Sequence, residues 1–259
     1  MRHRRLRRLA KRFGYEIIPT WRLERLRQSM FLERVFARYR VDLVVDVGAN
    51  IGQTRDYLRN HVAYEGSILS FEPNPQCFRV LRQRAENDRS WSAFEYAMGR
   101  EDGFSYLNVM SDDKLSSFRR PLVDEVPMFE GKNVIAETTK VTTKRLDSVW
   151  QEHELYKYSA PFLKLDTQGF DLEVLAGAGS RRDDLVGVQT EASVIPLYES
   201  MPPLDETVSR LKSWGFTLSD ASVVSRDDTM RAIEFDLVFL NDHKARRLME
   251  SGAPKPVVD

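Results

Sequence analysis

A glycine-bearing turn after an apolar strand pattern is the sharpest chemical signal in the chain. Residues 44–53 read Val-Val-Asp-Val-Gly-Ala-Asn-Ile-Gly-Gln and lead into a helical pattern. Gly48 can adopt backbone conformations closed to other residues and lets a ligand approach, and Gly52 lets the following helix pack closely on the strand. Asp46, near the end of the strand, can receive a cation or a hydrogen-bond donor. We therefore predict a ligand site on this turn.

The glycine spacing bears on which ligand the turn would bind. A dinucleotide fingerprint is G-x-G-x-x-G, whose middle glycine admits the pyrophosphate. Here three residues separate Gly48 from Gly52. The spacing disfavours NAD, so a nucleotide-dependent oxidoreductase is the weaker alternative.

A carboxylate follows the next apolar run. Residues 71–75 read Phe-Glu-Pro-Asn-Pro, which places Glu72 where doubly wound folds present an acid to the two ribose hydroxyls. Asn74 and Pro75 also fit an N-cap and a first helical position, which would explain the stretch without a ligand. Because the glycine turn lies one βα unit earlier, we interpret Glu72 as a ribose ligand.

A lysine lies within an apolar strand pattern at residues 161–166, which read Pro-Phe-Leu-Lys-Leu-Asp. Alternation places Lys164 and Asp166 on the same face of this strand, together with Phe162. A central parallel strand is covered on both faces, so the ammonium group of Lys164 must meet a carboxylate. Asp46 and Asp166 are the available acids.

These polar residues are expected to meet in one crevice. The first and fourth strands of a doubly wound sheet are neighbours at the switch point, which would bring Asp46, Lys164 and Asp166 together with the strand-ending Glu191. A buried ion-pair network that only fixes the strand register is the alternative for Lys164. For Asp166 we favour function, since it ends its strand and Gly169 opens the following turn.

Short apolar runs alternate with helical patterns from residue 43 onward, which predicts one α/β domain with a doubly wound, mostly parallel sheet. The expected strands cover residues 43–47, 67–71, 93–97, 162–166 and 187–191, and a late pair lies near 216–219 and 235–240. Helices are expected after Gly52, Pro75 and Phe170 and over residues 204–214. The pattern weakens over residues 99–145, where we predict an insertion over the open edge of the sheet that can act as a lid.

The bulk composition limits the classes of protein. The 259 residues are 42% hydrophobic, enough for one sizeable core. With 39 basic and 39 acidic residues the formal net charge is zero, which does not favour a nucleic-acid partner. Cys77 is the only cysteine, which excludes an internal disulfide and a cysteine-based metal cluster and fits a reducing cytoplasm.

Residues 1–40 are rich in arginine and predict a basic amphipathic helical extension, made of two short helices broken near Pro19, before the main domain at residues 41–259. The segment lacks the continuous apolar run of a signal peptide or a membrane span. It can pack on its own domain or contact an anionic membrane surface or a partner. We expect a cytoplasmic protein, with peripheral contact at the inner membrane surface as a further option.

Three blocks together, at residues 46–53, 71–75 and 164–169, resemble the FkbM family of S-adenosylmethionine-dependent methyltransferases in order and spacing. The resemblance runs from about residue 42 to 241. It implies a class I methyltransferase fold, S-adenosylmethionine as the cofactor and, usually, O-methylation of a sugar or natural product. The expected cofactor-binding residues are Asp46, Gly48, Ala49, Asn50, Gly52, Gln53, Glu72, Pro73 and Asp166.

The sequence departs from the family pattern in the third block. The usual Asp-x-Glu-Gly-x-Glu reads Asp-Thr-Gln-Gly-Phe-Asp at residues 166–171. Gln168 replaces a carboxylate and Asp171 shortens another, so an acidic role at position 168 does not follow.

Transfer of a methyl group from a sulfonium is an in-line displacement, and a hydroxyl acceptor must also lose a proton. The candidate catalytic residues are Asp166, Glu191, Lys164 and His153. His153 has a near-neutral pKa but lies in a polar stretch with an ordinary surface explanation. We predict no metal. The acceptor is expected to be a small molecule or a glycan, with sugar, polyketide and lipid left open, and a non-catalytic cofactor-binding domain remains the alternative.

Overall fold

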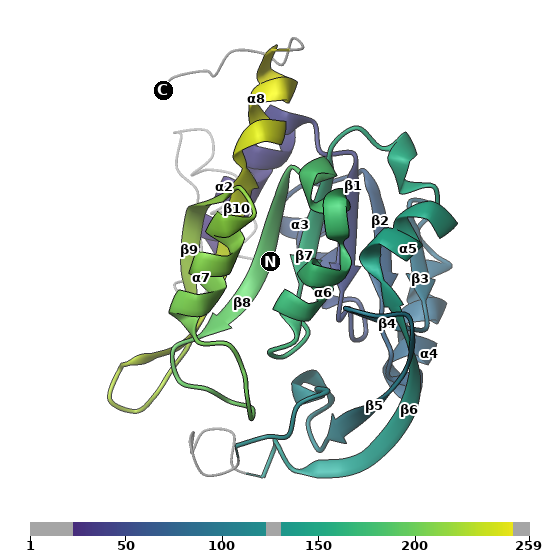
Figure 1. Ribbon diagram of the computed structural model, residues 1–259, viewed down its shortest axis with the longest axis vertical. Coiled ribbons are helices and arrows are strands. Elements are labelled where there is room, and N and C mark those ends of the chain that lie inside the picture. The colour runs from purple at the N-terminus through teal and green to yellow at the C-terminus, as the bar shows by residue number, and fades with distance from the viewer. Residues whose placement is uncertain (1–22, 123–130, 251–259) are drawn as a thin grey trace, which may run out of the picture.

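A seven-stranded sheet organises the computed structural model, which describes residues 23–122 and 131–250 (Figure 1). The strands lie in the order β3-β2-β1-β7-β8-β10-β9. Their bounds are β1 Leu43–Val47, β2 Ser67–Phe71, β3 Trp91–Phe94, β7 Pro161–Leu165, β8 Gly187–Ser193, β9 Phe216–Arg226 and β10 Ala232–Asn241. The first five are parallel to one another, and β10 runs antiparallel to both β8 and β9. The predicted doubly wound, mostly parallel sheet is confirmed.

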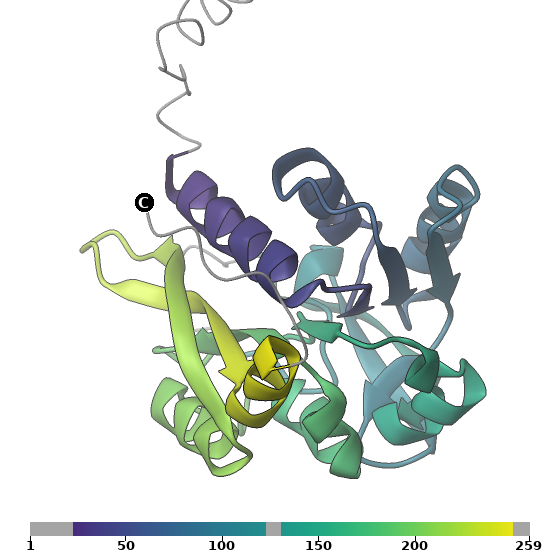
Figure 2. The same cartoon turned by 90° about the horizontal axis from the view of Figure 1, so that it is seen from above.

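Helices cover both faces of this sheet, as Figure 2 shows. Their bounds are α2 Leu23–Tyr39, α3 Gln53–His61, α4 Pro75–Ala85, α5 Leu146–Glu152, α6 Asp171–Gly177, α7 Leu204–Ser213 and α8 Asp242–Glu250. Apolar side chains of α2, α3 and α4 pack in one cluster with Val44 and Phe162, and those of α5, α6 and α7 pack in another with Leu163 and Leu165. The alternation predicted for β7 is therefore confirmed, because Phe162 faces one layer of helices and the two leucines face the other.

The direction of winding reverses between β1 and β7, which are hydrogen-bonded neighbours with Asp46 opposite Lys164. Chain segments that leave the carboxyl ends of these two strands diverge to opposite faces of the sheet and open a crevice between them. The parallel strands β1, β2, β7 and β8 end near this crevice. Residues at or just after these strand ends are therefore brought together although they lie far apart in the sequence.

The strand expected at residues 93–97 was wrong as a single element. β3 ends at Phe94, and Ala97–Gly99 forms a separate strand, β4, which pairs with Thr143 to Arg145. The buried ring of Tyr96 packs against Phe71, and the chain leaves the edge of the large sheet at that point. An apolar run shows that a strand forms but not which partner it pairs with.

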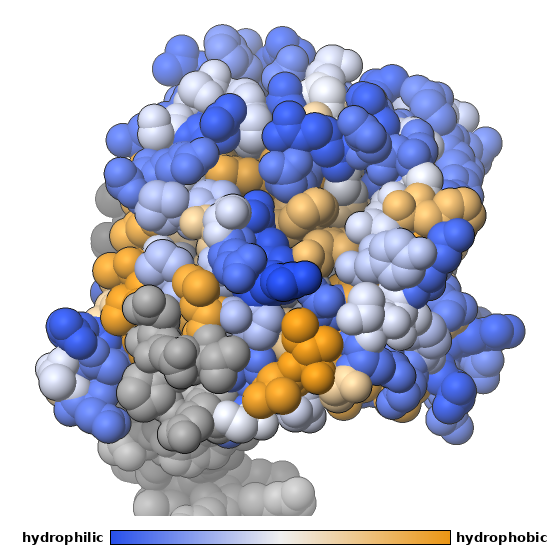
Figure 3. Space-filling model, turned by 60° about the horizontal axis from the view of Figure 1, so that its bottom comes forward, coloured by the Kyte–Doolittle hydropathy of each residue, from blue (hydrophilic) through white to orange (hydrophobic). Residues whose placement is uncertain are grey.

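A second, three-stranded sheet forms within residues 97–145, in the order β4-β6-β5. β5 is Gly103–Met110 and β6 is Ile135–Arg145, and the two form a long antiparallel ribbon that reaches past the end of the large sheet (Figure 1). The segment between them contains a short 3-10 turn at Asp113–Leu115. When this end faces the viewer, the surface is largely hydrophilic with separate hydrophobic patches (Figure 3).

The late strand pair and the N-terminal extension also differ from expectation in extent. β9 and β10 have 11 and 10 residues, longer than predicted, with shifts of register between them. α2 is the second of the two helices expected in residues 1–40, and the first lies outside the described residues. Leu32, Val35 and Phe36 of α2 are buried in the core of the domain.

None of the helices within the described residues is long and apolar enough to span a membrane.

Replacing Leu163 tests the core around which these elements pack. Leu163 is fully buried at the centre of β7, so Leu163→Ala should lower the free energy of unfolding by about 2–5 kcal/mol through lost burial and a residual cavity. Leu218→Ala on β9, where 37% of the residue is exposed, should change it by less than about 0.5 kcal/mol. Urea denaturation measures both, and equal losses would contradict this assignment of the core.

Candidate functional site

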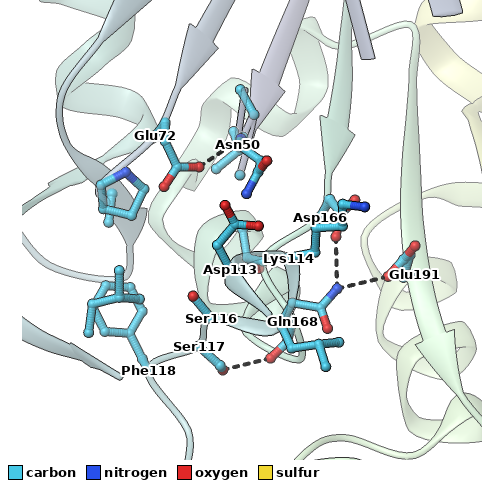
Figure 4. A pocket seen from close by; sticks show the side chains of 18 of the residues that line it. Asn50, Glu72, Asp113, Lys114, Ser116, Ser117, Phe118, Asp166, Gln168 and Glu191 are labelled. Atoms are coloured by element: carbon cyan, nitrogen blue, oxygen red, sulfur yellow. Dashed lines mark hydrogen bonds between the residues drawn. The ribbon is translucent and has the colours of Figure 1, made fainter. Parts of the chain in front are cut away.

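A cavity of about 520 Å³ opens at the carboxyl edge of the large sheet. Figure 4 shows side chains from the ends of β1, β2, β7 and β8 around it, with the segment 113–118 on the opposite side. Its volume lies within the range of roughly 300–1,000 Å³ that is typical of small-molecule sites. The predicted residues that line it are Gly48, Ala49, Asn50, Gln53, Glu72, Pro73, Asp166 and Glu191.

The turn after β1 is held by backbone contacts on two sides. The N–H groups of Gly48 and Ala49 both donate to the carbonyl of Phe71 at the end of β2, at 3.0 and 3.1 Å. Gly48 has a φ of 80°, and a Cβ there would lie 1.9 Å from the carbonyl oxygen of Asp166. Glycine is therefore required at this position by the neighbouring strand, before any ligand is considered.

Gly52 allows close packing of the helix and does not form part of the cavity wall. It has a φ of 94°, precedes α3, and a Cβ there would lie 2.6 Å from the ring of Trp91. The predicted close approach of the helix is confirmed, with the indole of β3 as the surface that the glycine meets. Gly52 does not line the cavity.

Glu72 lies beside the turn, as expected, and is only 6% exposed. One carboxylate oxygen accepts the N–H of Asn50 and the other accepts the N–H of Asn74, each at 2.7 Å. Burial raises the pKa of Glu72 to about 7 even though these two hydrogen bonds lower it. Since each oxygen can accept a further bond, the carboxylate is oriented and still able to receive hydroxyl groups.

Asp46 does not reach the cavity. Its side chain is completely buried beneath the turn, where it accepts a hydrogen bond from Ser70 Oγ at 2.8 Å, and Ser70 in turn accepts one from Trp91 Nε1. Burial raises the pKa of Asp46 to about 6. The expectation of direct cofactor contact is corrected: Asp46 supports the turn from below, because alternation directs its side chain onto the face of the sheet.

Lys164 pairs with a different set of acids from the predicted one. Its Nζ lies 3.9 Å from Asp166 and 3.8 Å from Asp236, while Asp46, its register partner, forms no ion pair with it. Burial lowers the pKa of Lys164, but the carboxylates of Asp166 and Asp236 outweigh this and raise it above its ordinary value. Lys164 does not line the first cavity, so the structure assigns it charge balance beneath Asp166 rather than contact with the reacting groups there.

Asp166 and Glu191 are joined by the amide of Gln168 (Figure 4). Its Nε2 donates to Asp166 at 2.9 Å and to Glu191 at 3.2 Å, and its Oε1 accepts from Tyr198 Oη at 2.9 Å. Burial and the nearby Asp166 carboxylate raise the pKa of Glu191 well above its ordinary value. An amide suits this position because a third carboxylate there could donate to neither acid unless protonated.

Asp171, where the sequence differs from the usual family pattern, also has a structural role. Its carboxylate is buried and accepts the backbone N–H of Thr167 at 3.0 Å together with the hydroxyls of Thr167 and Thr190. These bonds tie the turn after β7 to β8. Asp171 therefore fixes the loop that carries Gln168 and does not line the cavity.

His153 lies apart from the predicted site. Its ring is 4.2 Å from the ring of Phe94, and its Nε2 is 2.8 Å from Tyr96 Oη. Burial lowers the pKa of His153. Since it does not line the cavity, the structure removes it as a candidate base and gives it a packing role beside β3.

Several residues of the site were missed by the sequence interpretation. The segment Asp113 to Phe118 forms one wall, and Ser117 Oγ donates to the carbonyl of Gln168 at 2.8 Å. Glu234 of β10 forms another part of the wall, and burial raises its pKa to about 7. The acids of β10 had a signal in the sequence, since Glu234 and Asp236 alternate with apolar residues in a buried strand. The serines had none, because their position depends on how the segment folds back.

Within the described part of the chain, no three or more His, Cys, Asp or Glu side chains are grouped so that they could hold a metal ion. The acids near Lys164 are instead arranged around one ammonium group and one amide. The cavity thus combines an oriented carboxylate at one end with a cluster of acids at the other.

Comparisons with known proteins identify the family of this chain. The methyltransferase FkbM domain matches residues 46–218 of the chain. Methyltransferase sdnD of Sordaria araneosa is 30% identical over 165 residues, which cover 55% of this chain and 62% of that protein. The match therefore spans less than two thirds of this relative.

Solved structures with a similar arrangement include the methyltransferase FkbM of Methylobacillus flagellatus, with 14% identity and a TM-score of 0.46, over 77% of this chain and 43% of that chain. A METTL16 methyltransferase domain is 11% identical with a TM-score of 0.47, over 86% of this chain and 70% of that chain. Since the domain match covers more than half of the sequence, the chain belongs to the FkbM methyltransferase family.

Proposed function

We propose that this methyltransferase binds S-adenosylmethionine in the 520 Å³ cavity and methylates a hydroxyl group of a small acceptor. The observation that carries the proposal is the position of the Glu72 carboxylate beside the Gly48 turn at the switch point of the sheet. In doubly wound folds this arrangement receives the ribose of an adenosine.

The residues present fit this cofactor at both ends of the cavity. Glu72 offers two hydrogen-bonded oxygens to the ribose hydroxyls, and Met98 and Leu107 supply an apolar wall next to it. At the other end, Asp166 and Glu191 supply negative charge. Carboxylates there favour a cationic group such as a sulfonium. When bound, S-adenosylmethionine supplies a methyl group on a positively charged sulfur.

Glu191 is the residue that we assign to take the proton of the acceptor hydroxyl. It lines the cavity, and its raised pKa gives it a higher proton affinity than an ordinary glutamate, as a general base requires. Asp166 has its charge balanced by Lys164 and is the weaker candidate.

Gln168 and Tyr198 act as positioning residues for this pair of acids. The amide of Gln168 fixes the separation of the two carboxylates, and Tyr198 fixes the orientation of the amide because its hydroxyl donates to Oε1. The chain thus holds the proton acceptor in one orientation before an acceptor molecule arrives, and less reorganisation is needed during the reaction.

Calorimetric titration tests the cofactor. S-adenosylmethionine and S-adenosylhomocysteine should bind, and NAD should not. Glu72→Ala should weaken the binding of S-adenosylhomocysteine by about 1–3 kcal/mol, since the ribose hydroxyls would lose a buried partner. Glu95→Ala, an exposed residue outside the cavity, is the matched control and should leave binding unchanged. Binding of NAD alone would overturn the proposal.

Cofactor binding should also depend on pH. The pKa of Glu72 is about 7 in the free protein, and hydroxyl donors stabilise the ionised carboxylate, so binding lowers this pKa and releases a proton. The Kd for S-adenosylhomocysteine should therefore fall as the pH rises from about 6 to about 8 and level off above it. Glu234 and Glu191 titrate in the same cavity, so the comparison with Glu72→Gln isolates the contribution of Glu72. An identical pH profile in this variant would contradict the role of Glu72.

The assigned base is tested by transfer kinetics, once a hydroxyl acceptor has been found by screening with radiolabelled S-adenosylmethionine. Glu191→Gln should lower kcat by about 10²–10⁴-fold, the usual contribution of a general base. The Kd for S-adenosylhomocysteine should change much less. Glu199→Gln, on the exposed surface nearby, serves as the control. A kcat in Glu191→Gln equal to that of the control would remove Glu191 from the mechanism.

A further inference from the structure

A second cavity, of about 310 Å³, lies against the face of the sheet that α2 and α3 cover. One wall consists of polar side chains of β7, β8 and β10, and includes Lys164, Gln189 and Asp236. The lining also contains Phe36 of α2, residues of α3, and residues of β9, the strand next to β10. The lining therefore combines aromatic and aliphatic side chains with many polar ones, which suits a small molecule that carries several polar groups.

The two cavities meet at the candidate base. Their linings share Gln53, Thr54, Asp166, Glu191 and Val224. A transfer reaction with two substrates needs two binding sites that converge where the group is exchanged, within reach of the group that takes the proton. Asp166 and Glu191 lie at the junction, whereas Glu72 belongs to the first cavity alone.

Polar groups in the second cavity lack partners within the described part of the chain. Gln28 is 5% exposed and its Nε2 has no hydrogen-bond acceptor, and Asp236 Oδ1 has no hydrogen-bond donor. Lys164 Nζ donates to the carbonyl of Leu165 at 2.9 Å, and its two carboxylate neighbours lie beyond hydrogen-bond distance. Leaving a buried polar group unpaired costs about 1–3 kcal/mol, so an occupant that both accepts from Gln28 and donates to Asp236 would be stabilised here.

We propose that the second cavity binds the methyl acceptor, and that the acceptor is a compact, uncharged molecule with neighbouring hydroxyl groups. This inference rests on the proposed function. A hydroxyl can accept from Gln28 or Lys164 and donate to Asp236 at the same time, which an ammonium group or an ionised carboxylate cannot do. Lys164 and the carboxylates of Asp166 and Asp236 all line the cavity, so either sign of charge on the acceptor would lie close to a like charge.

The volume of the cavity limits the size of the acceptor, and the junction with the first cavity determines where the reaction takes place. A single ring of five or six atoms with its hydroxyls fits into 310 Å³, and the contacting rings of Phe36 and Phe162 form an apolar part of the lining. A further hydroxyl reaches the junction, where its O–H bond breaks and the proton passes to Glu191. The oxygen forms a bond to the methyl carbon while the carbon–sulfur bond of the donor breaks, which leaves a neutral thioether.

Ligand-observed NMR on the full chain saturated with S-adenosylhomocysteine tests the proposal. The probes are glycerol, myo-inositol and methyl β-glucopyranoside, added singly. At least one should receive saturation from the wild-type protein. Gln28→Leu, which keeps the volume but removes the unpaired donor, should weaken that binding by about tenfold, as loss of one buried hydrogen bond predicts. Gln189→Leu on β8 repeats the test from another element, and Glu33→Leu on the exposed side of α2 is the control.

The affinity for S-adenosylhomocysteine separates the outcomes. It should be the same in Gln28→Leu and in the wild-type protein. If Gln28→Leu weakens S-adenosylhomocysteine instead, the second cavity holds the amino-acid end of the cofactor and the inference is overturned. It is also overturned if no probe binds the saturated wild-type protein. Failure of the wild-type protein to bind S-adenosylhomocysteine at all would contradict the proposed function itself.

Discussion

The contact between the Gly48 turn and the end of β7 is the constraint on which the site depends. The backbone of the turn lies so close to the carbonyl of Asp166 that no side chain fits between them, and its N–H groups are used by the end of β2. Three strand ends are thereby fixed relative to one another. This packing positions the Glu72 carboxylate at one end of the cavity and the acid pair of Asp166 and Glu191 at the other end.

The polar network around Lys164 explains how several acids coexist inside the domain. One ammonium group is set between Asp166 and Asp236, and one amide joins Asp166 to Glu191. Removing either link would leave a buried carboxylate without its partner, which is costly in a low-dielectric interior. Asp236 Oδ1 on the face of the sheet and Gln28 Nε2 on α2 have no hydrogen-bond partner within the described residues, and from these groups we infer a second binding site.

The sequence predicted those parts of the site that follow from strand ends. Glu72 and Asp166 directly follow the parallel strands β2 and β7, and Glu191 lies in the last part of β8; parallel strands in a doubly wound sheet end at the same edge. Asp236 could not be placed in this way, because β10 inserts antiparallel between β8 and β9. The structure places His153 outside the cavity, although its residue type suggested catalysis. Its position depends on the packing of α5, which the periodicity of the sequence does not specify.

The insertion of β10 has a consequence for how the chain acquires its native state. Asp236 is made long after Lys164 during synthesis, so the ammonium group remains without this counter-ion until the last strand enters the sheet. Until then, among the described residues, the ammonium group has only the carboxylate of Asp166 at ion-pair distance, and the C-terminal hairpin adds a second carboxylate to the same buried cluster. Docking of the β9–β10 hairpin is therefore the step that completes the cluster of charged side chains around Lys164.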